Sequence, residues 1–372
     1  MNLRSALIRL GASLGAILLA LALSSIVLLI IDRSPLEAFA AMGSYASRVD
    51  SMISIINRAV PLYVSAVAVA VGFQMKLFNI GVEGQYRIAA LVAAWVGGAV
   101  ALPGILHVSL IILVAALVGA AWSSIAGILK AFRGVHEVIS TIMLNFIGTG
   151  LGAWLLANHF REETEGGSLI IATARIPESG RLPSLNPVLE GLGVEVPSGS
   201  DLHSFVLFAI LLGVGYYVLI WRTRLGYDLR AFGANPGAAE ASGVNLKRMT
   251  LITMAISGAF AGLVVMGPVL GSFHRYTTDI PIELGFTGIA VALVGRNRPV
   301  QMALAALLFA FLNRSAQILD FRGIPKEIET IIGGVIILTV VIANELARRV
   351  IQAQEVRDAA AKTARDDEEV PA

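Results

Sequence analysis

The class of fold is decided by Phe78-Asn79-Ile80-Gly81-Val82-Glu83-Gly84-Gln85, a polar, glycine-broken stretch between two apolar segments. Irregular backbone is not left exposed to lipid, because its free amide and carbonyl groups would have no water to bond. Such a break must face protein or a water-filled cavity. The carboxylate of Glu83 within it predicts a path for a polar solute.

The composition describes a chain whose solvent is mainly lipid. Of its 372 residues, 56% are hydrophobic and only 15% are charged, and the mean hydropathy is +0.77. The apolar runs are continuous and about 17 to 25 residues long, which is the length of a membrane-spanning helix. We therefore expect an all-α, polytopic membrane protein with some broken or re-entrant segments.

Ten segments are predicted to span the membrane, with both termini in the cytoplasm. The first, after Arg4 and Arg9, is too long for a cleaved signal peptide and is expected to stay in the protein. Basic residues favour the cytoplasmic side, and they gather at Lys130, Arg133 and the loop 222–248. The segments are 10–31, 60–74, 88–102, 108–129, 138–157, 205–221, 249–270, 284–294, 300–312 and 328–342.

The chain divides into a permease-like membrane domain, residues 1–351, and a charged tail, residues 352–372, expected to be disordered and cytoplasmic. Two long segments lie outside the membrane on opposite sides. Residues 158–203 are extracytoplasmic, and they form either a docking surface for a partner or an irregular loop. Residues 222–248 form the cytoplasmic loop.

A complete short helix is predicted within the cytoplasmic loop. Asn235 caps its start, Pro236 suits the first helical position, and Gly243 closes the end. It is too short to span the membrane and too polar to insert. Pressing into a groove on a soluble partner is one use of such a helix, and returning the chain to the membrane is the other.

Several classes of function are excluded. The chain has no cysteine, its five histidines have no ligand-like spacing, and its net charge of +2 is too small to indicate nucleic acid. We expect no catalytic residue, metal or cofactor. No Gly-Lys dipeptide occurs, so the phosphate-binding loop of an ATPase is missing. Transport must use an ion gradient or a separate ATPase, and the scarcity of charges within the spans argues against a gradient-driven secondary transporter.

Four groups of motifs cover most of the chain. They are GF with KLFNIGVEGQ within residues 72–85, GVHEVISTIMLN at 134–145, LGYDLRAFGANP at 225–236 with GVNLKR at 243–248, and GFTGIAVALVG at 285–295. In these motifs and in their order, the chain resembles the permease subunits of bacterial ABC importers for nucleosides and simple sugars.

The resemblance implies a ten-helix permease in the bacterial inner membrane, in contact with lipid. It implies three protein partners: a related but distinct second permease, a cytoplasmic ABC ATPase and an extracytoplasmic substrate-binding protein. It also assigns ATPase coupling to the short helix and its flanks, with Arg230 and Glu240 as polar contacts. The coupling residues are Arg230, Asn235, Pro236, Gly237, Ala238, Ala239, Glu240, Ala241, Ser242 and Gly243.

The resemblance further implies polar residues along the translocation pathway, with Phe78 or Phe286 stacking weakly on a base. These residues are Asn79, Glu83, Gln85, Glu137, Asn145 and Thr287. Structural roles are the alternative for three of them. Glu83 would satisfy the amides of a broken helix, Glu137 would favour a helix dipole, and Asn79 would cap the next helix. We expect that replacing Glu83 with glutamine impairs uptake without reducing membrane abundance.

Sequence detail favours nucleosides as the substrate over a sugar such as ribose or a hexose, because FNIGVEGQ and EVISTIMLN are more similar to the nucleoside-type permeases. The external loop and residues 271–276 depart from the family pattern. These departures bear on the identity of the binding protein and on fine specificity.

Overall fold

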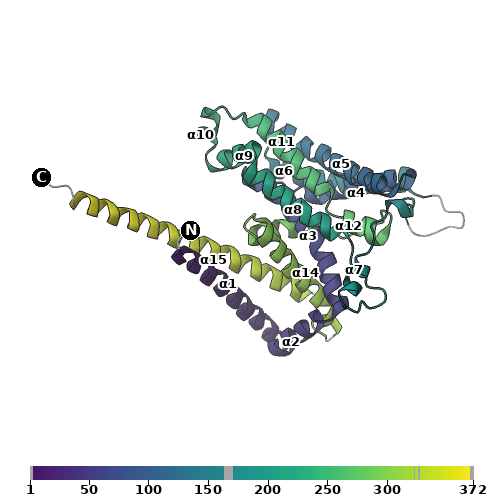
Figure 1. The fold of residues 1–372 in the computed structure, drawn as a ribbon, viewed down its shortest axis with the longest axis horizontal. Helices are drawn as coiled ribbons and strands as arrows, with labels where there is room; N and C mark the ends of the chain where they lie inside the picture. The colour runs from purple at the N-terminus through teal and green to yellow at the C-terminus, as the bar shows by residue number, and fades with distance from the viewer. Residues whose placement is uncertain (1–2, 163–170, 322, 326, 369–372) are drawn as a thin grey trace. The chain divides into compact units, whose positions relative to one another are not determined.

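The structure, a computed structural model, describes residues 3–162, 171–321, 323–325 and 327–368 (Figure 1). Within these ranges the chain is helical, and its strand-like pairing is limited to two isolated bridges, Ala172 with Thr277 and Ser184 with His203. The expected all-α class is confirmed. The chain forms two compact units: Met1–Tyr45 with Ser315–Ala372, and Ala46–Arg314.

The first unit is a long antiparallel pair with a sharp corner. Helix α1 (Leu3–Ile30) packs along α15 (Glu327–Glu368), and α2 (Pro35–Ala46) follows α1 after a bend of 116°. Arg33, at the corner, donates a hydrogen bond from Nη2 to the carbonyl of Gly323 at 2.8 Å. Residues 352–368 of the predicted disordered tail continue α15 as helix.

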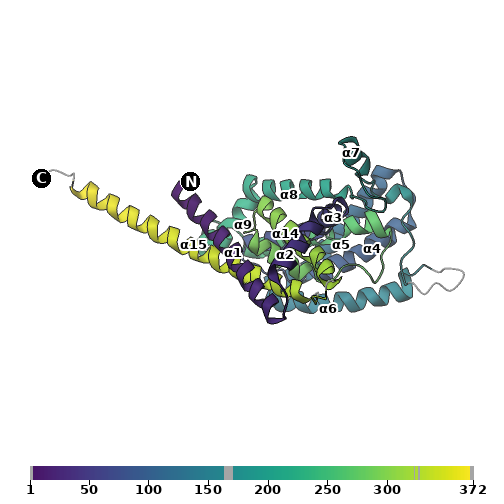
Figure 2. The ribbon, with the colours of Figure 1, turned by 90° about the horizontal axis from the view of Figure 1, so that it is seen from below.

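The second unit is built around α3 (Val49–Gln74), which is buried almost throughout its second half. Around it pack α8, α11 and α13, while α4, α5, α6 and α11 pack against one another (Figures 1 and 2). The bounds are α4 Val82–Ala99, α5 Gly104–Arg133, α6 Glu137–Leu155, α8 Phe205–Arg222, α11 Leu246–Gly262, α13 Leu284–Val294 and α14 Pro299–Phe321.

Helices α5 and α11 cross at very short distance because both carry glycine at the crossing. A Cβ atom on Gly119 would lie 2.2 Å from the carbonyl oxygen of Gly258, and one on Gly262 would lie 2.0 Å from that of Ala115. Small residues let two helix backbones approach in this way, which is how membrane helices pack without a hydrophobic driving force.

The expected count of ten spanning helices is not confirmed. Each predicted segment falls in a helix, but seven described helices are long and apolar enough to cross a membrane, or eight if the bent pair α1–α2 counts as one span. The exceptions are α4, which begins with the polar residues of the break, and α13, which has only 11 residues. The span predicted from residue 60 begins earlier, since α3 starts at Val49 despite its polar first turns.

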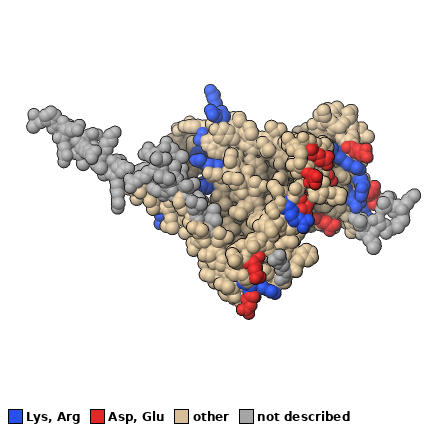
Figure 3. Space-filling view, turned by 60° about the horizontal axis from the view of Figure 1, so that its bottom comes forward, with Lys and Arg blue, Asp and Glu red and all other residues tan. Residues whose placement is uncertain are grey.

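Residues 158–203, which the sequence predicts to be extracytoplasmic, are folded where they are described. This segment contains η1 (Leu156–Phe160), η2 (Glu178–Gly180) and α7 (Asn186–Gly191), and residues 163–170 lie outside the described ranges. Its backbone amides bond η3 (Val269–Phe273), which follows α12 (Met266–Pro268), and the residue after η3: Leu182 donates to the carbonyl of Leu270, and Ile176 donates to that of His274. His203 closes this segment, and burial lowers its pKa below the usual value. The surface drawn in Figure 3 is mostly uncharged, with charged side chains gathered in a few places.

Candidate functional site: two half-helices that meet at Glu83

Helices α4 and α13 begin inside the second unit, and their first turns lie next to each other. Ser65 of α3 donates from Oγ to the carbonyl of Leu284, the first residue of α13, at 2.8 Å. Ser65 lies roughly 14 Å along α3 from its end at Gln74, at about 1.5 Å per residue. The start of α13 therefore lies well inside the length of α3, at a depth where lipid would surround an exposed helix end.

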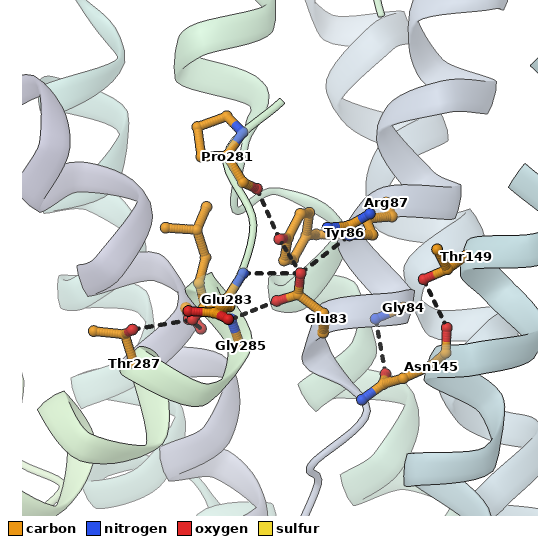
Figure 4. A network of polar contacts seen from close by, with 12 residues as sticks. Glu83, Gly84, Tyr86, Arg87, Asn145, Thr149, Pro281, Glu283, Gly285 and Thr287 are labelled. Atoms are coloured by element: carbon orange, nitrogen blue, oxygen red, sulfur yellow. Dashed lines mark hydrogen bonds and ion pairs between the residues drawn. The ribbon is translucent and has the colours of Figure 1, made fainter. Parts of the chain in front are cut away.

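The carboxylate of Glu83, in the first turn of α4, joins the two helix starts (Figure 4). Its Oε1 accepts from the amide of Glu283 at 3.0 Å, and its Oε2 accepts from the amide of Gly285 at 3.1 Å. The free amides of α13 thus receive a negatively charged partner, which the positive end of a helix dipole favours.

Two side chains of α4 itself complete the shell of Glu83. Tyr86 Oη lies 2.6 Å from Glu83 Oε1, and Arg87 Nε donates to the same oxygen at 3.0 Å. The Tyr86 hydroxyl also lies 2.9 Å from the carbonyl of Pro281, just before α13. Four donors therefore surround the carboxylate, three at Oε1 and one at Oε2. In this arrangement both of its oxygens are bound by protein groups.

The close approach of α13 requires glycine at position 285. A Cβ atom there would lie 2.6 Å from the amide nitrogen of Glu83. Just before it, Glu283 adopts a φ of 64°, a left-handed conformation that glycine or asparagine tolerates better than glutamate. The turn into α13 is therefore tight, and it sets the amides of Glu283 and Gly285 against the carboxylate.

The start of α4 is held by amide side chains. Asn79 and Gln85 form a reciprocal pair, with Nδ2 to Oε1 at 3.0 Å and Nε2 to Oδ1 at 2.8 Å. Asn79 also accepts from the amide of Gly81 and donates to Ser257 of α11. The predicted capping role is not found in this form, because the N-cap of α4 is Gly81, which has no side chain; Asn79 instead bonds the amide just before the helix.

Asn145 reaches the same helix start from α6. Its Oδ1 accepts from the amide of Gly84 at 2.8 Å, and its Nδ2 donates to the carbonyl of Ile80 at 2.9 Å. The sequence motifs around Gly84 and Asn145 thus form one packed unit. A Cβ atom on Gly84 would lie 2.8 Å from the Cα of Asn145, so glycine is needed at this contact.

Glu137 and Thr287 lie at the edges of this region. Glu137, in the first turn of α6, accepts from Lys130 Nζ at 2.7 Å and from the amide of Phe78 at 3.4 Å. Thr287 is half-buried, and its Oγ1 donates to the carbonyl of Glu283 at 3.0 Å. Of the six predicted pathway residues, five are buried and bonded to protein groups: Asn79, Glu83, Gln85, Glu137 and Asn145.

The sequence analysis missed several residues of this site. Tyr86 and Arg87 follow Glu83 at the helical spacings i+3 and i+4, so the pattern of side chains on one helix face could have indicated them. Ser257, Glu283 and Gly285 carry no such signal, because they are distant in sequence and meet Glu83 or Asn79 only through tertiary packing.

Residues 222–248 contain the predicted short helix. Helix α9 (Arg224–Ala234) leads to α10 (Pro236–Ala241), where Asn235 Oδ1 accepts from the amide of Ala238 at 3.2 Å. Gly243 has a φ of 87°, and the amide after it bonds back to Ala239, so the predicted cap and closing glycine are confirmed. Ala239 is the one buried residue of α10, and the rest of that helix is exposed.

Helix α9 rests on the end of α3, since a Cβ atom on Gly233 would lie 2.0 Å from the carbonyl oxygen of Gln74. Only four residues lie between Gln74 and Asn79, so α9 contacts the chain that leads into the break. Arg230 bonds the carbonyl of Gly226 within α9, and Glu240 is exposed on α10. The structure makes no ion pair between these two side chains in the residues it describes.

A multi-helix membrane protein with two half-helices meeting in its interior, and an exposed short helix on one side, has the features of a transport permease. Residues 51–341 match the family model described as the permease component of branched-chain amino acid transport systems. The chain belongs to this family of ABC transporter permeases. It is therefore a transport subunit rather than an enzyme, and the family implies a separate ATPase and a substrate-binding protein as partners.

Characterised relatives include permeases for nucleosides and for sugars. The chain is 35% identical to the guanosine ABC transporter permease NupP of Bacillus subtilis, over 87% of this chain and 91% of the relative. It is 32% identical to the nucleoside permease NupB of Lactococcus lactis, over 76% of each. It is also 32% identical to the glucose permease TsgB13 of Haloferax volcanii, over 91% of this chain and 88% of the relative.

Proposed function

We propose that this chain is the membrane-spanning subunit of an ATP-driven importer and that it translocates nucleosides delivered by an extracytoplasmic binding protein. The similarity to a guanosine permease along nearly the whole of both chains carries the choice of nucleosides. The second candidate is a simple sugar, favoured by the similar match to a glucose permease. Both classes of substrate carry neighbouring hydroxyl groups.

The proposed assembly pairs this chain with a related but distinct second permease, two ATPase subunits and the binding protein, in the bacterial inner membrane. Both termini and the α9–α10 segment lie on the cytoplasmic side, where Lys247, Arg248 and the basic residues of α9 also lie. Residues 158–203 face outward and receive the binding protein.

Coupling is proposed to run from α10 through α9 to the break. The exposed surface of α10 receives the ATPase, and the contact of Gly233 with Gln74 passes its displacement to the end of α3. Nucleotide binding shifts the permease between two states only if this contact differs between them. The coupling residues are those predicted from the sequence: Arg230 and the run Asn235, Pro236, Gly237, Ala238, Ala239, Glu240, Ala241, Ser242 and Gly243.

The pathway is proposed to pass beside the starts of α4 and α13. In this proposal Asn79, Gln85 and Asn145 hold α4, Glu83 holds α13, and Glu137 holds the turn at Phe78. Thr287 is the member of the predicted set with an accessible side chain at that level. Import requires that the solute be released into the cell. The binding protein therefore holds the solute tightly, and the residues beside the pathway hold it weakly.

Uptake of labelled guanosine, uridine, ribose and glucose, in cells with and without this gene, tests the substrate. We expect nucleoside uptake to fall and sugar uptake to persist. Loss of sugar uptake alone would move the chain to the second candidate. In parallel, the ATPase should copurify with the wild-type permease, and replacing Ala238 with aspartate, which puts a charge on the exposed surface of α10, should release it. Replacing Ala101, which is also exposed but lies outside the coupling residues, with aspartate is the matched control.

A further inference from the structure

An exposed face at the start of α13 combines a charge with large apolar side chains. Ile282 is 60% exposed and Phe286 is 51% exposed, and Glu283 between them is also exposed. Glu283 and Phe286 are three residues apart, so they lie on the same side of the first helical turn. The peptide amide of Glu283 is bound by Glu83, but in the described part of the chain its own carboxylate forms no hydrogen bond or ion pair.

The depth of this face is incompatible with contact to lipid. The next residue, Leu284, is bonded to Ser65 well inside the length of α3. A carboxylate at such a depth costs several kcal/mol in hydrocarbon, and ionisable residues there almost always face the protein interior or a water-filled cavity. Glu283 also adopts a left-handed backbone, which adds strain of order 1 kcal/mol.

A second polar group follows on the same side of α3. Arg58 lies seven residues before Ser65, which is close to two helical turns, and it is exposed and bonded to Asn313 of α14. Arg58 is thus an exposed polar side chain on the face of α3 that carries Ser65, nearer the start of that helix.

We infer that Glu283 is a substrate-contacting residue of the pathway, whose carboxylate accepts hydrogen bonds from two neighbouring hydroxyls of the solute while Phe286 packs against its ring. The inference rests on the proposed import of nucleosides. A carboxylate suits a vicinal diol because its two oxygens are acceptors and lie close together. Glu83 could bind a diol with both oxygens only by breaking its hydrogen bonds to the start of α13.

The natural absence of cysteine allows a direct test of exposure to water. Single-cysteine variants Glu283→Cys and Phe286→Cys of the assembled transporter, in membrane vesicles, would be treated with a charged, water-soluble thiol reagent. Leu211→Cys is the control, because Leu211 is 65% exposed in the middle of α8 and is apolar. We expect rapid reaction at 283 and 286, slowed by uridine, and little reaction at 211. Reaction at 283 and 286 no faster than at 211 would overturn the inference.

Uptake by conservative variants tests the contact with the diol. Glu283→Gln keeps one acceptor oxygen, and we expect its uridine uptake at low concentration to fall about tenfold, since a hydrogen bond to a charged group is worth about that factor. Uptake of 2′,3′-dideoxyuridine, which lacks both hydroxyls, should change much less. Equal losses for both solutes, or no loss for either, would refute the contact. If the wild type imports no nucleoside, the proposed function fails first, and ribose with its matched deoxy sugar then tests Glu283.

Discussion

At the scale of single residues, Glu83 is the group whose replacement is most informative. The sequence analysis expects glutamine at this position to impair uptake without reducing abundance, whereas the structure indicates a loss of stability. A glutamine would place an NH₂ group against one of the amides of Glu283 or Gly285, leaving a buried donor unpaired. That costs about 1–3 kcal/mol. We expect Glu83→Gln to lower the melting temperature of the purified permease and its level in the membrane.

The matched control is Glu283→Gln, because Glu283 is exposed and its carboxylate bonds nothing in the described residues. Its melting temperature should stay near that of the wild type, measured in the same detergent. Normal stability of Glu83→Gln together with lost uptake would return Glu83 to the role of a pathway residue.

At the scale of elements, the crossing of α5 and α11 determines how closely the second unit packs. A Cβ atom on Gly258 would lie 2.4 Å from both the carbonyl oxygen of Gly119 and the Cβ of Ser123, so the helices must separate to admit it. Overpacking of this kind costs about 1–3 kcal/mol. We expect Gly258→Ala to lower the melting temperature and to weaken the hydrogen bond that Asn79 donates to Ser257, which depends on the position of α11.

Gly150 of α6 supplies the control, since a Cβ atom there meets nothing within 4 Å. Alanine at that position should leave the melting temperature unchanged or raise it slightly, because alanine favours helix over glycine. A Gly258→Ala variant as stable as Gly150→Ala would show that the helices separate without cost.

At the scale of the whole molecule, the orientation in the membrane is the property to test. Helix α8 joins residues 158–203 to α9, so this segment and the one that holds α9 and α10 lie at opposite ends of that helix (Figure 1). In intact cells, a membrane-impermeant thiol reagent should label Ser198→Cys and should label Glu240→Cys only after permeabilisation. Both positions are exposed. Labelling in the reverse order would overturn the orientation predicted from basic residues.

The fold class follows from local properties of the sequence. Continuous apolar runs predict membrane helices because lipid requires every backbone group to bond within its own segment. The short helix α10 follows for the same reason of locality, since Asn235, Pro236 and Gly243 act on neighbouring backbone groups. The number of full spans was harder to predict from the sequence, because the polar start of α4 and the short α13 are stabilised by partners elsewhere in the chain.

By itself, then, the sequence determined the helical membrane class, the break at residues 78–85 and the capped helix of the cytoplasmic loop, all of which depend on near neighbours. Only the tertiary structure decided what Glu83 binds, since the amides of Glu283 and Gly285 lie about 200 residues away along the chain. It also showed that the carboxylate of Glu83 is buried and bound by protein groups, whereas that of Glu283 is exposed. No local pattern distinguishes Glu83 from Glu283, because the difference comes from which backbone groups the packing of α13 on α3 and α4 brings within hydrogen-bond distance.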